Sequence, residues 1–223
     1  MPRAATSKLC GDPALMTVVG IDVGGARKGF HAVAITGGGY SSHIATKDVE
    51  VLAHWCRATV RARAIAVDAP CRWSKDGRAR PAERQLMAKK IWCFSSPTRQ
   101  RALNHPRNHF GWMLRGEALF RALEPTHALC RRLPLPGGKN HCFETFPHAI
   151  AWHLSQGRVI ASRKRVQRQQ LLVRSGIDTS RLTNIDLVDA ALCALVAYRT
   201  ATRAPCVSYG EPDTGLIIVP ASE

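Results

Sequence analysis

The segment TVVGIDVGGARKGFHAVAITGGGYSSHIAT, residues 17–46, decides the fold. Apolar, β-branched runs at 16–23 and 29–35 predict two buried strands. The glycine-rich stretch 36–39 predicts a tight turn into a third strand, so the three strands form an antiparallel meander. One carboxylate, Asp22, stands at the end of the first strand, directly before the apolar Val and a Gly-Gly pair.

The rest of the chain alternates strands and helices around one irregular segment. Apolar runs at 64–70 and 141–146 predict two more buried strands, and 215–220 predicts a closing edge strand. Helices are predicted at 47–63, 147–156, 163–175 and 184–200. Residues 71–138, rich in Arg, Lys, Pro and His, predict a partly helical insertion that covers one end of the sheet. This order predicts an α/β fold with a mixed five-stranded sheet and helices on both faces.

We expect a disordered, basic N-terminal extension over residues 1–15 and a single domain over 16–223 that contains the insertion. The extension lacks the apolar centre of a signal peptide, and no stretch approaches the roughly 18 apolar residues of a membrane span. The eight cysteines are scattered without a C-x-x-C pair, which argues against structural zinc. Free thiols fit a reducing, cytoplasmic location.

The charge balance is strongly basic. Lys and Arg number 32 against 16 Asp and Glu, which gives a formal net charge of +16. Such an excess indicates a polyanionic partner, most simply DNA or RNA. The alternative is a solvated basic surface without a specific partner.

Four acidic residues stand out because they lie in apolar surroundings: Asp22, Asp68, Glu144 and Asp189. The first three are at or near the carboxyl ends of predicted strands, where ligands of such sheets gather. Asp189 lies deep in the apolar helix LVDAALCALVA, with Asp186 one turn earlier on the same face. Clustered carboxylates repel one another unless a cation neutralises them, and hard oxygen ligands select Mg²⁺ or Mn²⁺. The pattern therefore predicts a two-metal site for phosphodiester hydrolysis.

Each of these acidic residues also has a structural interpretation. Asp22 and Asp68 are suited to turns that follow their strands. Glu144 can pair with an arginine or with His148. Asp186 is suited to the first turn of a helix, where it faces the positive end of the helix dipole. Asp189 has no such explanation, because capping does not require a carboxylate so deep in a helix.

Six motifs in order carry a family resemblance: GIDVGGARKGF, AVDAP, FETFP, SRKRVQRQQLL, NIDLVDAALCALVA and GLIIVP. With them the chain resembles the domain of unknown function (DUF) 429 family of predicted ribonuclease-H-like nucleases, over roughly residues 17–220. The D-x-x-D-A motif at 186–190 is also similar to the last helix of RuvC-type Holliday-junction resolvases.

The resemblance implies a ribonuclease-H-like fold and a metal-dependent nuclease. It implies that Asp22, Asp68, Glu144 and Asp189 are metal ligands and that Asp186 takes part in catalysis. The resolvase likeness allows a homodimer. The family's usual Arg followed by Cys-Asp in the insertion is replaced here by RPAERQL, which offers Arg80, Glu83 and Arg84.

Two other functions fit parts of the sequence. An ATP-dependent phosphotransferase of the actin and sugar-kinase type opens with a similar GIDVGG loop, but such chains need a second lobe. A non-catalytic nucleic-acid-binding protein would use only the basic residues. The basic residues predicted to contact nucleic acid are Arg27, Lys28, Arg80, Arg84, Lys89, Lys90, Arg163, Lys164 and Arg165.

Overall fold

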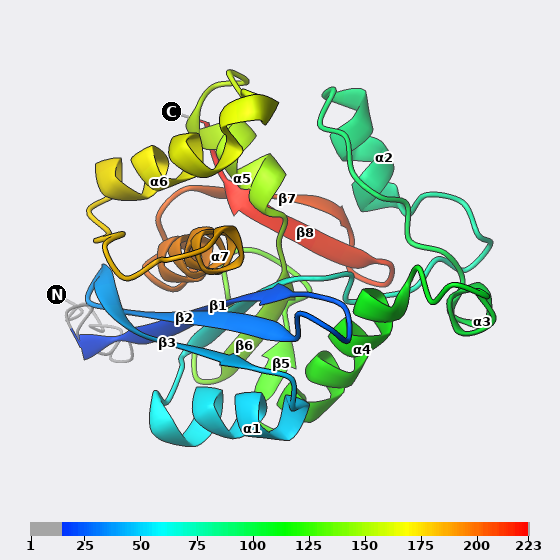
Figure 1. Cartoon of the computed structure of the whole chain (residues 1–223), viewed down its shortest axis with the longest axis horizontal. Coiled ribbons are helices and arrows are strands. Elements are labelled where there is room, and N and C mark those ends of the chain that lie inside the picture. The colour runs from blue at the N-terminus through cyan, green and yellow to red at the C-terminus, as the bar shows by residue number, and fades with distance from the viewer. Residues whose placement is uncertain (1–14, 223) are drawn as a thin grey trace, which may run out of the picture.

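The computed structural model describes residues 15–222, and its first three strands form the predicted antiparallel meander (Figure 1). Strand β1 (Thr17–Val23) pairs with β2 (Phe30–Thr36), which pairs with β3 (Gly39–Thr46). Gly37 and Gly38, between β2 and β3, have φ angles of 58° and 87°. Two consecutive positive φ angles match the right-handed twist of the strands in a tight hairpin, which explains the glycines.

Parallel strands extend the meander on the other side of β1. Strand β4 (Ala64–Asp68) lies parallel to β1, and β6 (Asn140–Glu144) lies parallel to β4. A three-stranded meander followed by parallel strands, in the order β3-β2-β1-β4-β6, is the ribonuclease-H-like arrangement predicted from the sequence. The carboxyl ends of β1, β4 and β6 therefore meet at one edge of the sheet.

The sheet has eight strands in the described chain, which corrects the predicted five. Strand β8 (Gly215–Pro220) is not an edge strand, because β7 (Cys206–Glu211) pairs with it on the outside. A short strand, β5 (His127–Leu129), pairs with β6 inside the predicted insertion. Three residues are too few to show a period, and the six residues of β7, CVSYGE, hold only two full alternations and a glycine, so neither strand was predicted.

Helices cover both faces of the sheet, as predicted. Helix α1 (Val49–His54), its π-helical continuation (Trp55–Thr59) and α4 (Gly111–Leu123) pack on one face. Two further helices of the insertion are α2 (Pro81–Ala88) and α3 (Arg99–Leu103). The opposite face carries α5 (Pro147–Leu154) and α7 (Ile185–Ala201), with α6 (Lys164–Arg174), preceded by a 3-10 turn (Ala161–Arg163), packed beside them. Helices α2, α3 and α4 all lie within residues 71–138, which the sequence predicted to be a partly helical insertion.

Helix α7 lies directly against the backbone of β1. A Cβ atom placed on Gly20 would come within 2.0 Å of the Ala194 nitrogen and 2.1 Å of the Ala190 oxygen. Only glycine permits this approach. Because α7 is so close, its N-terminal turns reach the carboxyl end of β1, where the acidic residues lie.

No helix among residues 15–222 has the length and apolarity needed to cross a bilayer. The predicted N-terminal extension lies, apart from Leu15, outside the described residues. The division into an extension and one domain stays a prediction.

Candidate metal centre

Asp22 and Asp68 are direct neighbours on adjacent parallel strands. Asp22 of β1 is the register partner of Asp68 of β4, so both side chains point to the same face of the sheet. That face is the one on which Gly20, two residues before Asp22, meets α7. The structure therefore brings together two carboxylates that are 46 positions apart in the sequence (68 − 22).

Helix α7 adds two more carboxylates to this place. The Asn184 side chain caps the helix by accepting a hydrogen bond from the Leu187 N–H at 2.8 Å. Asp186 lies in the first turn and Asp189 one turn later on the same face. We call Asp22, Asp68, Asp186 and Asp189 the acidic cluster.

The cluster raises the pKa of its two strand residues. Burial, followed by the negative charges of Asp189 and Asp186, raises the pKa of Asp22 to about 7. Burial, followed by the charges of Asp22 and Asp189, raises the pKa of Asp68 well above its usual value. Within residues 15–222 neither carboxylate has a hydrogen bond or an ion pair. The nearby charges of Lys28, Lys164 and Arg168 offset these effects only in part, so two adjacent carboxylates are left without a direct partner in this part of the chain.

His31 lies beside the acidic cluster, although the sequence analysis did not single it out. It is the register partner of Asp22 on β2, and its Nδ1 is buried without a hydrogen-bond partner among the described residues. One ligand atom each of Asp22, His31 and Asp186 lie within 4.8 Å of one another. Burial lowers the pKa of His31, which favours the neutral imidazole that binds metal ions. Only the pairing of β1 with β2 reveals this residue.

The two helix carboxylates of the cluster are neutralised by basic side chains. The Lys28 ammonium lies 2.9 Å from Asp186 Oδ1, and the Lys164 ammonium lies 3.3 Å from Asp189 Oδ2. Asp189 also forms a buried ion pair with Arg168, a residue that the sequence analysis did not predict for the site. Both lysine side chains are about half exposed, whereas Arg168 is buried.

The structure does not place Glu144 in the acidic cluster. Glu144 is the register partner of Val67, so it points to the opposite face from Asp68, one residue further along. Its carboxylate accepts two hydrogen bonds from Arg80, at 2.6 and 2.9 Å, and one from the Cys71 N–H at 2.9 Å. Asp68 and Glu144 border the same small recess of about 50 Å³, but Arg80 neutralises Glu144.

Arg80 and Glu83 complete a buried ion network with Glu144. The Arg80 Nε donates to Glu83 Oε1 at 2.8 Å, and the Ser96 hydroxyl donates to the same oxygen at 2.6 Å. Arg80 is 3% exposed, so it is not available to contact a nucleic acid as predicted. We call Arg80, Glu83 and Glu144 the buried ion network.

The other predicted basic residues lie at the surface. Lys28 and Lys164 contact the acidic cluster, as described above. The remaining ones are exposed: Arg27, Arg84, Lys89, Lys90, Arg163 and Arg165.

The donors of the acidic cluster fit a hard divalent cation. Asp22, His31 and Asp186 have ligand atoms close enough to share one cation, and Asp68 and Asp189 interact with Asp22 through their charges. Together they make the oxygen-rich surroundings that Mg²⁺ and Mn²⁺ prefer. The buried, unpartnered Nδ1 of His31 and the unpaired carboxylates of Asp22 and Asp68 are atoms that such a cation would satisfy. The residues present therefore fit the predicted metal.

The chain belongs to the family described as "Protein of unknown function (DUF429)", whose model matches residues 20–214. This confirms the resemblance seen in the sequence. A solved structure of RuvC from Thermus thermophilus is similar at 15% identity and a TM-score of 0.45, covering 85% of this chain and 98% of that chain. A structure of T. thermophilus RuvC in complex with a Holliday junction substrate is similar at 14% identity and a TM-score of 0.41, covering 85% of this chain and 97% of that chain. A search of curated proteins found no match to this sequence.

Proposed function

We propose that this member of the DUF429 family is a nuclease that hydrolyses phosphodiester bonds of nucleic acid with Mg²⁺ or Mn²⁺. The observation that carries the proposal is the pair formed by Asp22 and Asp68, neighbours in register that have no partner among the described residues. A carboxylate pair of this kind destabilises the fold unless something else binds it. A function at the site explains why the pair is present.

The ligands in this proposal are the four residues of the acidic cluster, with His31 in addition. Asp189 would offer Oδ2, which among residues 15–222 pairs only with the half-exposed Lys164, because Arg168 holds Oδ1. Glu144, which the sequence placed among the ligands, is left out because Arg80 and Cys71 already occupy its oxygens. Bound divalent cations would supply an activated water and stabilise the leaving oxygen in an in-line displacement.

The chain's own basic side chains would hold the substrate. Lys28 and Lys164 are paired with Asp186 and Asp189 and are half exposed. With those carboxylates held by a cation, both ammonium groups would be available for phosphate oxygens next to the cleaved bond. Exposed Arg27 and Arg163, each next to one of these lysines in the sequence, would contact flanking phosphates.

The decisive test is cleavage of labelled single-stranded, duplex, hybrid and junction substrates with Mn²⁺. We expect the wild-type protein to cleave at least one of them. Asp68→Asn should lower the rate by more than the roughly 10–100-fold that loss of an outer-shell partner costs. Asp213→Asn, which removes the same charge from an exposed position paired with Arg131, should leave the rate unchanged.

Two results would favour the alternative functions. Hydrolysis of ATP without cleavage of any nucleic acid would support the phosphotransferase. Salt-dependent binding of nucleic acid without hydrolysis would support a binding protein. A homodimer and a cytoplasmic location stay predictions.

A further inference from the structure

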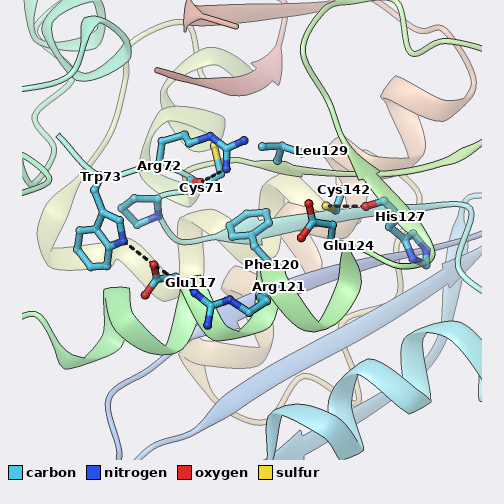
Figure 2. Close-up of a pocket in the computed structure, with 11 residues that line it drawn as sticks. Cys71, Arg72, Trp73, Glu117, Phe120, Arg121, Glu124, His127, Leu129 and Cys142 are labelled. Carbon is cyan, nitrogen blue, oxygen red and sulfur yellow. Dashed lines mark hydrogen bonds and ion pairs between the residues drawn. The ribbon is translucent and has the colours of Figure 1, made fainter. Parts of the chain in front are cut away.

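A second site lies on the other face of the sheet, close to the end of β4. It is a pocket of about 210 Å³ between the loop that follows β4 and the helix α4 (Figure 2). The pocket is smaller than the sites that hold drug-sized ligands or whole cofactors, and its size suits a single ring system.

One stripe of α4 forms a wall of the pocket. Glu117, Phe120, Arg121 and Glu124 follow one another at helical spacing and all line it. Figure 2 shows the Phe120 ring in the middle of this wall, with Trp73 on one side and Glu124 on the other. The wall therefore combines an aromatic ring with both signs of charge.

The loop after β4 forms the facing side, and its tryptophan is held in place. The Trp73 Nε1 donates a hydrogen bond to Glu117 Oε1 at 3.1 Å. Glu117 also accepts from the Arg99 Nε at 2.9 Å, so its carboxylate is occupied. Arg72 and Arg121, both exposed, add positive charge to the pocket.

Glu124 is the carboxylate that remains available to a ligand. It is exposed and lines the pocket, and its side chain has no hydrogen bond or ion pair within residues 15–222. An ionised carboxylate only accepts hydrogen bonds and can accept two in parallel. It would repel a phosphate, so the group that enters the pocket must present N–H donors.

These features together match an unpaired nucleobase. Aromatic side chains give bases a surface on which to stack, and arginines hold the phosphates on either side. Among the common bases, guanine presents two adjacent donors, N1–H and the N2 amino group, on its Watson–Crick edge. Guanine is therefore the base that can donate a hydrogen bond to each oxygen of the Glu124 carboxylate.

The pocket is within reach of the acidic cluster. Pro70, which lines the pocket, is two residues after Asp68, so their Cα atoms are at most about 7 Å apart. Asp68 points toward the face of α7, whereas α4 covers the opposite face. A strand that crosses the end of β4 could therefore have a phosphate at the cluster and a nearby base in the pocket.

We propose that this pocket binds an unpaired guanine of the nucleic acid, close to the phosphate that is cleaved. The proposal rests on the proposed nuclease function and narrows its substrate. A base can enter the pocket only when it is unstacked and unpaired. The preferred substrates are thus single strands, or duplexes with an extrahelical guanine near the scissile bond.

Binding and cleavage are measured separately in the test. Short fluorescent thymidine strands that carry one guanine, or one inosine in its place, are titrated with protein in Ca²⁺. Inosine lacks only the N2 amino group, so we expect the wild-type protein to bind it about tenfold more weakly, as for loss of one hydrogen bond to a charged group. A strand with 7-deazaguanine, whose Watson–Crick edge is intact, should bind like guanine.

Glu124→Gln should remove the preference for guanine over inosine while thermal unfolding stays unchanged, because the residue is exposed. Glu50→Gln, an exposed glutamate on α1, is the matched control and should retain the preference. Equal binding of the two strands by the wild-type protein, or a preference that survives Glu124→Gln, would overturn the proposal.

Cleavage of the same strands in Mn²⁺ distinguishes the two proposals. Cleavage without a guanine preference overturns the pocket assignment alone. A guanine preference without cleavage of any strand overturns the nuclease assignment and leaves the pocket as a base-binding site.

Discussion

The acidic cluster and the buried ion network lie at the same edge of the sheet, yet their carboxylates are in opposite situations. Asp22 and Asp68 have no partner within the described chain, and burial together with the other aspartates raises the pKa of each. Glu144 accepts three hydrogen bonds, two of them from Arg80. Location at a strand end alone therefore does not make a carboxylate a candidate metal ligand. The carboxylate must also lack a partner inside the protein.

The two regions also differ in the cations that neutralise them. Arg80 is enclosed and its pKa is raised, mainly by Glu144, against the effect of burial. In the acidic cluster Arg168 is buried as well and pairs with Asp189, but Lys28 and Lys164 are half exposed and each holds one carboxylate. A guanidinium in a buried network is a permanent part of the fold, whereas an exposed ammonium can be exchanged for a metal ion or a phosphate.

The largest expected effect comes from breaking the buried ion network. Arg80→Met leaves Glu83 and Glu144 as buried, unpaired carboxylates, so we expect a loss of about 3–5 kcal/mol in the free energy of unfolding. Denaturant unfolding measures it, and Arg84→Met, a change at an exposed arginine, is the control. If Arg80→Met fails to fold, adding Glu83→Gln and Glu144→Gln should restore folding. A loss below about 1 kcal/mol would show that the network is not structural.

In the acidic cluster, we expect removal of a charged side chain to raise the free energy of unfolding, which is the opposite of the effect in the buried ion network. The pKa of Asp22 is about 7 in the folded chain, against 3.8 as its ordinary value. The folded state thus holds a proton that the unfolded state releases, and the wild-type protein loses stability as the pH rises from about 4 to 7. Asp22→Asn removes this loss, so at pH 8 the variant should be more stable by up to about 4 kcal/mol.

Thermal and denaturant unfolding at several pH values measure this difference. Near pH 4 the difference in stability between Asp22→Asn and the wild-type protein should vanish. At pH 8, Mn²⁺ should stabilise the wild-type protein but not Asp22→Asn. Destabilisation by Asp22→Asn in the absence of metal would mean that Asp22 has a partner and that the two regions are alike.

The prediction with the smallest expected effect tests whether a metal ion can displace Lys164 from the acidic cluster. Lys164→Gln removes the ammonium that competes with a metal ion for Asp189, so Mn²⁺ should bind a few-fold more tightly, as measured by calorimetry. The same variant should bind single-stranded nucleic acid more weakly and with a smaller salt dependence. Lys75→Gln, at an exposed position outside the acidic cluster, is the control. Weaker binding of Mn²⁺ by Lys164→Gln would contradict the idea that Lys164 and a metal ion compete for Asp189.

Much of the fold could be predicted from the sequence. Period-two and helical patterns located the meander, β4, β6 and α7, because these elements are long or fully buried. The same patterns missed β5 and β7, and they made β8 an edge strand. Short strands are defined by the neighbour with which they pair, and no local period records that neighbour.

The candidate site was likewise predictable from the sequence only in part. The sequence by itself determined that Asp22, Asp68 and Asp189 are carboxylates in apolar segments, since that follows from composition around each residue. Only the tertiary structure decided that His31 lies beside Asp22, that Glu144 turns to the other face and that Arg80 is buried. The physical reason is the register of the strands: a shift of one residue moves a side chain to the opposite face, and the register is set by pairing between distant segments.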